Sequence, residues 1–395
     1  MTTAPPAFPQ ARVCPHLPPP AYAELRGGPA LRRVTTHAGQ LAWLVTRYDQ
    51  ARTLLKDPRL SSDRRRPGFP VISVQVQLLT ERKRQALIGM DPPEHDEQRR
   101  MFLPDFTLKK VRERRADIER IVHESLDDML EHGPPADLYR EFALPVPFRV
   151  ICRLLGAPWE DRDFFQDAIR RLVRTFDTAE GRQAGAELLG YFEHLVTEYK
   201  KTPDGAGLIG RLAGTGRIGD DDLALAAMSL LIAGHETTAA MISLGAVTLM
   251  ENPDQLAAIR ANPEAITPAV EELLRFQSIA DSANLRVATA DIEIDDVVIK
   301  AGEGVLIPGS LANRDAGVFT DPDVFDPSRD AGGHIAFGYG RHQCLGQNLA
   351  RLELQIALTA LWQRIPTLRM TVPAEELAPR PPGAIQGIDA LPVTW

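Results

Sequence analysis

The sequence predicts a mostly α-helical protein with small β-sheets. The main observation is a series of long segments in which apolar residues recur with the period of an α-helix. These helical segments cover residues 108–132, 141–155, 159–177, 180–201 and 219–250. β-Branched and aromatic residues gather in two stretches, 31–46 and 292–307, which indicates a hairpin and a small sheet. Thirty-two prolines and 29 glycines provide abrupt helix ends and many loops.

Composition and charge are those of an ordinary soluble globular protein. Apolar residues make up 44% of the 395 residues and charged residues 25%. The net charge of −8 argues against a nucleic-acid-binding or membrane-surface protein. The amino terminus has no basic-then-apolar signal pattern, and the apolar run from Leu223 to Gly234 is too short to span a bilayer. We therefore expect a cytoplasmic protein with no membrane and no nucleic-acid partner.

Nothing in the sequence marks a domain boundary. There is no internal repeat, low-complexity block or shift in composition. We therefore expect residues 1–395 to form a single domain, in which residues 1–20 are an extended, proline-rich amino terminus.

The three cysteines exclude several kinds of site. Cys14, Cys152 and Cys344 are widely separated and form no Cys-x-x-Cys pair. A disulfide framework and a cysteine-based structural zinc site are therefore poorly supported. The absence of Cys-x-x-Cys-His also argues against covalently attached haem of the c type.

The amino-terminal part predicts small elements followed by a loop. Residues 20–26 and 48–56 predict short helices, and 31–46 predict a hairpin that turns at His37-Ala38-Gly39. Residues 62–80 show no clear period and contain Pro67, Gly68 and Pro70, so we expect a mobile loop.

A helix start follows at Met90-Asp91-Pro92-Pro93-Glu94-His95. His95 and Arg99 are four residues apart, so they share one face of this helix. They are either solvated surface residues or part of a site, and the residues alone favour neither interpretation.

The segment 219–250 is apolar nearly all round, which predicts a long helix buried on most sides. In its middle, Ala233-Gly234-His235-Glu236-Thr237-Thr238 places an acid, a histidine and hydroxyls where unpartnered polar groups are costly. Threonine hydroxyls bond back to the preceding turn and bend a helix. The cluster is either a satisfied polar kink or a water-lined notch with a proton-carrying acid beside a hydroxyl.

A further helix begins at Thr267-Pro268 and contains Glu272 and Arg275, three residues apart. This pair is either an exposed salt bridge of little value or a structural, partly buried pair held by a further arginine. Residues 312–343 then lack clear regular structure, and such a long loop is usually functional.

The stretch Phe337-Gly338-Tyr339-Gly340-Arg341-His342-Gln343-Cys344-Leu345-Gly346 precedes a helical segment at 349–361. A helix start stabilises a thiolate, and the glycines permit a close approach to a flat group. The residues thus predict a thiolate presented to a metal or cofactor. Haem, zinc and a cysteine nucleophile with His342 as its base remain alternatives, although no other catalytic motif supports the nucleophile.

Four patterns, in this order along the chain, resemble the signatures of the cytochrome P-450 family. They are His-x-x-x-Arg at His95, Ala-Gly-x-Glu-Thr-Thr at Ala233, Glu-x-x-Arg at Glu272 and Phe-Gly-x-Gly-x-His-x-Cys-x-Gly at Phe337. The last pattern is highly specific, and the resemblance covers essentially the whole chain. It implies the single-domain cytochrome P-450 fold, with haem b between the long central helix and the cysteine loop.

The resemblance also implies a role for each matching residue. Cys344 matches the axial thiolate ligand of the haem iron, and Glu236-Thr237 matches the acid–alcohol pair that serves O2 activation. The positions that match propionate-binding residues are His95, Arg99, Arg286 and His342. The positions that match a structural triad bracing the loop are Glu272, Arg275 and Arg329.

Details such as Asn313-Arg314-Asp315 are most similar to actinomycete members that oxidise secondary metabolites or xenobiotics. The resemblance implies a monooxygenase that hydroxylates or epoxidises a small lipophilic substrate such as a polyketide, macrolide, terpenoid or xenobiotic. Electrons are expected from NAD(P)H through a ferredoxin reductase and a ferredoxin, which would dock on basic residues at 109–115 and at Arg341 and Arg351. A solvated helix face is the alternative interpretation of the basic run.

Two other functions remain alternatives. A peroxide-driven haem-thiolate oxidase would not need the acid–alcohol pair, and a non-catalytic haem protein would bind a ligand without consuming NAD(P)H. His334 is expected to be a loop histidine bonded to the backbone.

Overall fold

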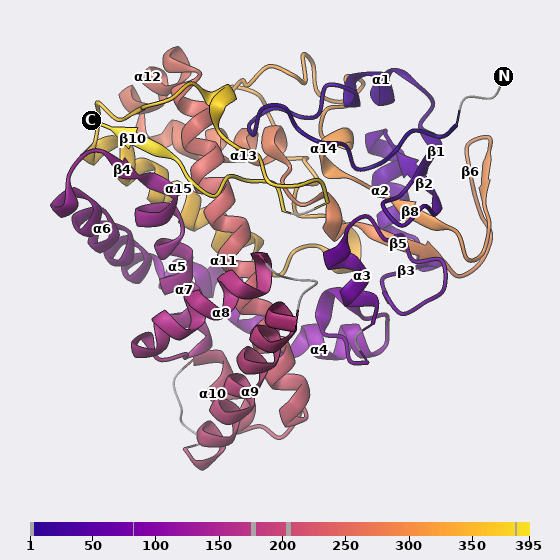
Figure 1. Ribbon diagram of the computed structural model, residues 1–395, viewed down its shortest axis with the longest axis horizontal. Helices are drawn as coiled ribbons and strands as arrows, with labels where there is room; N and C mark the ends of the chain where they lie inside the picture. Colours follow the sequence, from indigo (N-terminus) through magenta and orange to yellow (C-terminus); the bar gives the residue numbers. More distant parts are fainter. Residues whose placement is uncertain (1–3, 82, 175–178, 203–206, 384) are drawn as a thin grey trace.

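The computed structural model describes residues 4–81, 83–174, 179–202, 207–383 and 385–395. The helices that fill one side of the molecule pack around one long helix, and a five-stranded and a two-stranded sheet lie with short helices on the other side (Figure 1). The mostly helical fold with small sheets confirms the predicted fold class.

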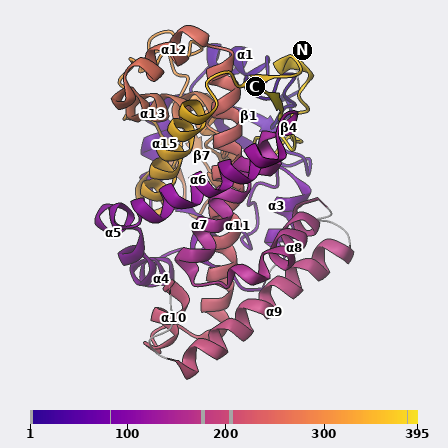
Figure 2. The same cartoon turned by 90° about the vertical axis from the view of Figure 1, so that its left-hand side faces the viewer.

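The long central helix is α11 (Asp220–Met250). Three aspartates in its first turn interact favourably with the positive end of the helix dipole. Most of the length of α11 is buried against α7 (Pro145–Leu155), α9 (Ala179–Lys201) and α15 (Gln347–Arg364). By length and composition α11 qualifies as a membrane span, but 72% of its most apolar window is buried inside the protein. That burial is typical of the core helix of a soluble protein. Figure 2 shows the other helices crossing it on several sides.

The remaining helices of this side follow the predicted segments with two differences. They are α5 (Leu108–Glu113), α6 (Arg115–His132), α8 (Arg162–Arg174), α10 (Gly207–Ala213), α12 (Pro253–Ala261) and α13 (Ile266–Gln277). The segment 108–132 is broken at Arg114, and 141–155 becomes a π-helical turn, Tyr139–Ala143, before α7. Pro145 lacks the N–H that a continuous α-helix needs at that point. The end of the segment predicted at 159–177 lies outside the described residues.

The other side is built on a five-stranded sheet of order β1-β2-β8-β5-β3. Its strands are β1 (Leu31–Thr35), β2 (Leu41–Val45), β3 (Leu60–Ser61), β5 (Leu285–Ala288) and β8 (Gly304–Leu306). The predicted hairpin is β1–β2, which pairs Leu31 with Val45. The stretch 292–307 is divided between two sheets, because β6 (Ile292–Ile294) and β7 (Val297–Ile299) pair only with each other.

Short helices complete this side: α1 (Tyr22–Gly27), α2 (Tyr48–Lys56), α3 (Val74–Thr80), α4 (Glu94–Phe102) and α14 (Gly309–Ala312). The prediction of a loop throughout 62–80 is wrong at its end, where α3 forms. Ser73 accepts a hydrogen bond from the Val76 N–H at 3.3 Å and Val76 is buried, so a cap and a core contact stabilise α3 despite its weak period.

The carboxy-terminal tail adds a third small sheet of order β4-β10-β9, from β4 (Ala136–Asp137), β9 (Arg369–Met370) and β10 (Pro392–Thr394). The long segment between α14 and α15 has no helix longer than the 3₁₀ turn Gly340–His342 within the described residues. The predicted irregular loop at 312–343 is therefore confirmed.

Candidate functional site

The cysteine loop has a backbone that only glycine accommodates at two points. Gly338 and Gly340 have φ values of +70° and +74°. A Cβ on Gly340 would lie 2.8 Å from the Leu55 carbonyl oxygen of α2. The Cys344 N–H donates to the Phe337 carbonyl at 2.8 Å, which closes the loop directly before α15. The loop therefore holds Cys344 in a fixed place.

The Cys344 side chain is accessible, and the surrounding protein atoms nevertheless raise the pKa of its thiol. A hydrogen bond from the Gly346 N–H and the charges of Arg99 and Arg351 act in the opposite direction and favour the thiolate.

No other protein metal ligand joins this cysteine. In the described parts of the chain, no group of three or more His, Cys, Asp or Glu side chains is arranged to hold a metal ion. A zinc site needs three or four such ligands, so the arrangement does not fit zinc. A single cysteine fits haem iron, because a bound porphyrin would supply the ligands that the protein does not.

Four cationic or hydrogen-bond-donating side chains lie together at the cysteine loop. They are His95 and Arg99 of α4, Arg286 of β5 and His342 of the loop itself. The rings of His95, on α4, and His342 are 4.1 Å apart between centroids. His95 is 1% exposed and Arg286, on β5, is 3% exposed, so a solvated surface position is wrong for His95. Within the described parts of the chain, the Arg286 side chain donates only to the backbone carbonyls of Ala283 and Leu285.

The pKa values of these groups show that positive charge is disfavoured at this place, where the guanidinium groups of Arg286 and Arg99 nevertheless stay charged. Burial, followed by the charges of Arg286, His95 and Arg99, lowers the pKa of His342 to about 2. Burial, followed by the charge of Arg64, lowers the pKa of Arg286 to about 10. Burial also lowers the pKa of Arg99. Buried cations that repel one another are stable only when anions compensate them.

Some of these side chains also have polar atoms without a hydrogen-bond partner. Among the described residues, His342 Nδ1 is buried with no partner and the Arg99 guanidinium makes no hydrogen bond or ion pair. His95 Nδ1 contacts Asp96 at 2.9 Å. Two propionate carboxylates would supply the anions and acceptors that His342, Arg99 and Arg286 lack. The residues present therefore fit haem.

The polar cluster lies at an interruption in the burial of the middle of α11. Ala233 is exposed, whereas Leu230 and Leu231 before it and Thr238 after it are buried. The Thr237 hydroxyl donates to the Ala233 carbonyl at 2.6 Å. The His235 ring is buried edge-on to Phe148, at 5.2 Å between centroids, and neither of its nitrogens has a hydrogen-bond partner among the residues that the structure describes.

Glu236 makes a contact that the sequence did not predict. Its Oε2 atom lies 3.0 Å from Arg380 Nη2, and the side chains are 15% and 9% exposed. The angle does not meet hydrogen-bond geometry, so we describe the contact as an ion pair. Arg380 also donates to Asp389 at 2.9 Å and to the Tyr139 hydroxyl at 2.7 Å. Arg380 lies 144 positions after Glu236 in a proline-rich tail, and no periodicity links the two.

Glu272 and Arg275 form a buried pair, so the interpretation as an exposed salt bridge is wrong. Both side chains are 0% exposed, and Arg275 donates twice to Glu272, at 2.6 and 2.7 Å. Arg275 also donates to the carbonyls of Asn313 and Pro322, and Arg329 Nε lies 3.3 Å from Glu272. The three charged residues thus connect α13 with the long loop that precedes the cysteine.

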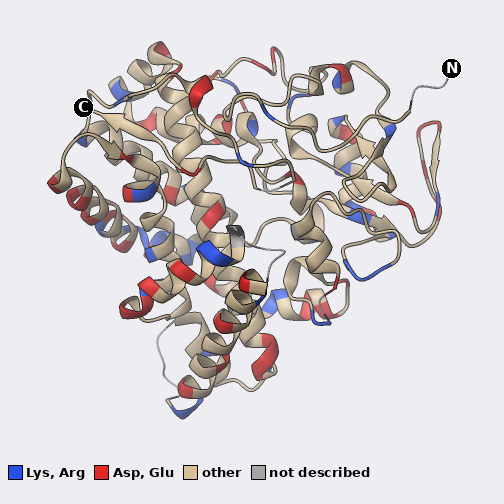
Figure 3. Cartoon of the chain, in the orientation of Figure 1, with Lys and Arg blue, Asp and Glu red and all other residues tan. Residues whose placement is uncertain are grey.

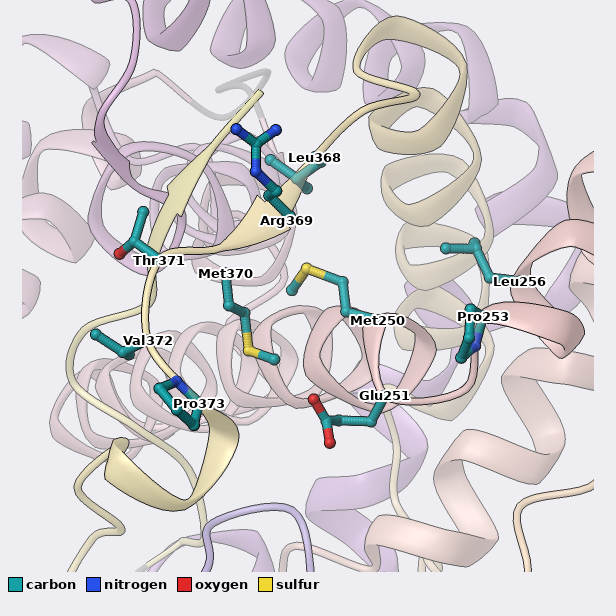
Figure 4. A pocket seen from close by; sticks show the side chains of 10 residues that line it. All are labelled: Met250, Glu251, Pro253, Leu256, Leu368, Arg369, Met370, Thr371, Val372 and Pro373. Carbon is teal, nitrogen blue, oxygen red and sulfur yellow. The ribbon is translucent and has the colours of Figure 1, made fainter.

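A separate surface pocket of about 540 Å³ lies between the end of α11 and residues 368–373 (Figure 4). It is lined mainly by apolar side chains such as Met250, Leu256 and Met370, with Glu251 as its carboxylate. It contains none of the residues predicted for the site.

Comparisons with known proteins agree with this geometry. The family model of cytochrome P450 matches residues 199–368. A vitamin D3 dihydroxylase of Streptomyces griseolus is 52% identical over 100% of this chain and 98% of its own length. The chain belongs to the cytochrome P450 family. Pentalenic acid synthase of Streptomyces avermitilis is 50% identical over 100% of this cytochrome P450 and 98% of its own length.

Solved structures give the same result. The crystal structure of mycinamicin VIII C21 methyl hydroxylase of Micromonospora griseorubida, bound to mycinamicin VIII, has a TM-score of 0.91 and 40% identity. The match covers 99% of this chain and 100% of that chain. This cytochrome P450 is accordingly an oxidoreductase, a haem-thiolate monooxygenase whose cofactor is haem b.

Proposed function

We propose that this cytochrome P450 hydroxylates or epoxidises a mid-sized lipophilic molecule of the polyketide, macrolide, terpenoid or xenobiotic class. The observation that carries the proposal is the partly exposed turn Ala233–Thr237 in the middle of the largely buried, apolar helix α11, where an acid and an alcohol are adjacent. Relatives named for vitamin D3, pentalenic acid and a mycinamicin support this substrate range.

We assign haem binding to five residues. Cys344 is the axial ligand of the iron, and His95, Arg99, Arg286 and His342 bind the propionates. The glycine loop that fixes Cys344 before α15, the unpartnered Nδ1 atom of His342 and the burial of Arg286 support these assignments. Glu272, Arg275 and Arg329 brace the loop that carries Cys344.

Haem, when bound, supplies the chemistry that activates O2 and transfers one oxygen atom to the substrate. The protein must supply protons and exclude other water. The Thr237 hydroxyl gives its hydrogen to Ala233, so it presents lone pairs that accept a hydrogen bond from a water molecule at this turn. It donates only after turning away from Ala233.

Glu236 is the acid that we assign to proton delivery. Its carboxylate pairs with Arg380, so it must leave that ion pair, or pass the proton through water, to serve the Thr237 side of the helix. Arg380 connects Glu236 to Asp389, which is 56% exposed and lies close to solvent.

We also propose that electrons arrive from a ferredoxin that is reduced by a ferredoxin reductase and docks at α5. The cations of this region cluster around α5, which packs against α15 (Figures 2 and 3). Three of the cations already form ion pairs: Lys110 with Glu113, Arg115 with Glu119, and Arg351 with Glu271. Lys109 and Arg112 are exposed and have no ion-pair partner among the described residues, so they are the cations best able to meet an acidic protein.

Neutralising both residues, Lys109→Gln and Arg112→Gln, tests this docking site. Reduction by ferredoxin is expected to become slower and less dependent on salt, because exposed charges act over about 10 Å at 0.1 M salt. Arg217→Gln, an exposed cation on the loop before α11, is the matched control. An equal effect of Arg217→Gln would contradict docking at α5.

The full chain, residues 1–395, is proposed to be a single cytoplasmic catalytic domain. The match of relatives and solved structures over nearly the whole chain supports this extent.

The substrate proposal is tested by titrating the ferric holoprotein with a library of these compound classes and then incubating each binder with NAD(P)H, ferredoxin and reductase. The expected result is a substrate-induced shift of the Soret band and a product that is one oxygen atom heavier. Turnover with peroxide alone would support the peroxide-driven alternative. Binding without any NAD(P)H consumption would support a non-catalytic haem protein.

A further inference from the structure

A second charged cluster lies beside the cysteine loop and takes no part in the assignments above. Glu271, on α13, accepts from Arg351 Nε at 2.7 Å and from Arg351 Nη2 at 3.1 Å. His334 Nε2 lies 3.2 Å from Oε2 of Glu271, the oxygen that also accepts from Arg351 Nη2. The side chains of His334, Glu271 and Arg351 are 0%, 18% and 25% exposed. The cluster thus joins α13, α15 and the segment that leads into the cysteine loop.

The hydrogen bonds determine which proton His334 carries. Its Nδ1 atom accepts from the Ala336 N–H at 3.1 Å, so the ring hydrogen must be on Nε2, which faces Glu271. The expected backbone bond of His334 is therefore present, and an unpredicted contact with a carboxylate accompanies it. The angle at Nε2 is poor for a hydrogen bond, so this contact is weaker than the two from Arg351.

Arg351 contacts the cysteine loop at two places. Its guanidinium lies over the Phe337 ring, 4.6 Å from the centroid, and the Phe337 carbonyl accepts the Cys344 N–H. Arg351 Nη1 donates to Gln347 at 3.0 Å, and Gln347 accepts from Gln343, the residue before Cys344. The charge of Arg351 is also one of those that favour the Cys344 thiolate.

We propose that Glu271 and Arg351 are positioning residues that set the charge beside the Cys344 thiolate, with His334 fixing Glu271 in place. Glu271 compensates the charge of Arg351 and holds its guanidinium over Phe337. The pair thereby keeps the thiolate a strong electron donor to the iron. The inference rests on the proposed role of Cys344 as the haem ligand.

The proposal predicts opposite effects for the two partners. In Glu271→Gln the Arg351 charge is uncompensated. The extra positive charge stabilises the reduced, ferrous state, so the ferric–ferrous midpoint potential rises. In Arg351→Gln the Glu271 charge is uncompensated, so the potential falls. We expect each single variant to shift the one-electron equilibrium about tenfold, which is about 59 mV. The double variant, Glu271→Gln with Arg351→Gln, should return to within about twofold of the parent.

Potentiometric titration of the purified holoproteins, each followed by a reduced-CO spectrum, is the experiment. Arg364→Gln is the matched control, because Arg364 pairs with Asp127 at 2.7 Å at the far end of the same helix. Shifts of the same sign in both single variants, or a double variant that stays shifted, would show that the pair acts only by loosening the loop and would overturn the proposal.

A second variant tests the same idea without removing either of the paired charges. His334→Asn keeps Glu271 and Arg351, so the potential is expected to stay within twofold of the parent equilibrium even if the protein melts at a lower temperature. A tenfold shift in His334→Asn would contradict a mechanism based on charge. Failure of the underlying ligand assignment is distinguishable, because the parent protein itself would then lack a thiolate-type reduced-CO band.

Discussion

Replacing Arg275 by lysine keeps the buried positive charge but removes the planar guanidinium, whose N–H groups donate to the surrounding acceptors. Arg275 is fully buried, donates twice to Glu272 and donates to two loop carbonyls at 2.8 and 2.9 Å. A lysine ammonium is a point donor and cannot span the carboxylate and both carbonyls together.

At least two of these hydrogen bonds to a charged group should be lost in Arg275→Lys. Each is worth about 1.5–3 kcal/mol, and breaking a buried ion pair costs about 3–5 kcal/mol. We therefore expect the free energy of unfolding to fall by about 3–5 kcal/mol. That is a large part of the about 5–15 kcal/mol that stabilises a typical domain.

The matched control is Arg153→Lys. Arg153 also makes two hydrogen bonds to one carboxylate, that of Asp117, at 3.0 and 2.9 Å, but its side chain is 54% exposed. Exposed pairs contribute about 0–1 kcal/mol. Urea unfolding of both holoproteins at the same haem concentration, followed by circular dichroism and the Soret band, measures the difference. Losses of equal size in the two variants would refute the argument that burial makes the Glu272–Arg275 pair essential.

Three further predictions concern the site. Glu236→Gln is expected to lower kcat by about 10²-fold or more and to enlarge the solvent isotope effect, because the proton carrier is lost; an unchanged isotope effect would contradict that role. Thr237→Ala is expected to divert reducing equivalents to peroxide, measured as peroxide formed per NAD(P)H, whereas coupling equal to the parent's would count against Thr237. Burial raises the pKa of Glu271, but its contacts with Arg351 and His334 outweigh burial and hold the pKa at about 2 instead of 4.5. Because this folded-state pKa is depressed, its contribution of about 3 kcal/mol is present above about pH 4.5 and is lost as the pH falls toward 2; Glu271→Gln should flatten the stability profile in that range, and a profile as steep as the parent's would contradict the assignment.

The larger elements were predictable because their apolar pattern and their end signals indicate the same helix. The apolar circumference of α11 requires burial wherever the helix lies, and the aspartates before Leu223 mark its start. Prediction failed for α3, where the alternating Val-Gln-Val-Gln sequence does not show a helical period. There the Ser73 cap and the burial of Val76 decide the conformation. It also failed to assign β8 to the five-stranded sheet, since pairing with β2 and β5 is not local in sequence.

Site residues were predictable where their neighbours in sequence carry a pattern. Glu272 and Arg275 share a helix face, and Cys344 lies in a glycine loop before a helix. The burial of His95 could not be predicted, because its helix has charged residues all round. Arg380 was missed because its partner, Glu236, comes from a distant segment. The contact of His334 with Glu271 was missed for the same reason.

The central claim is that Cys344 presents a thiolate to haem iron, and the reduced-CO difference spectrum tests it most directly. The parent protein is expected to show the thiolate-type band, and Cys344→Ser and Cys344→Ala should both lose it. Cys152→Ser, which changes a buried cysteine that packs in the core, should retain the band. A thiolate-type band that persists in Cys344→Ser would contradict the account.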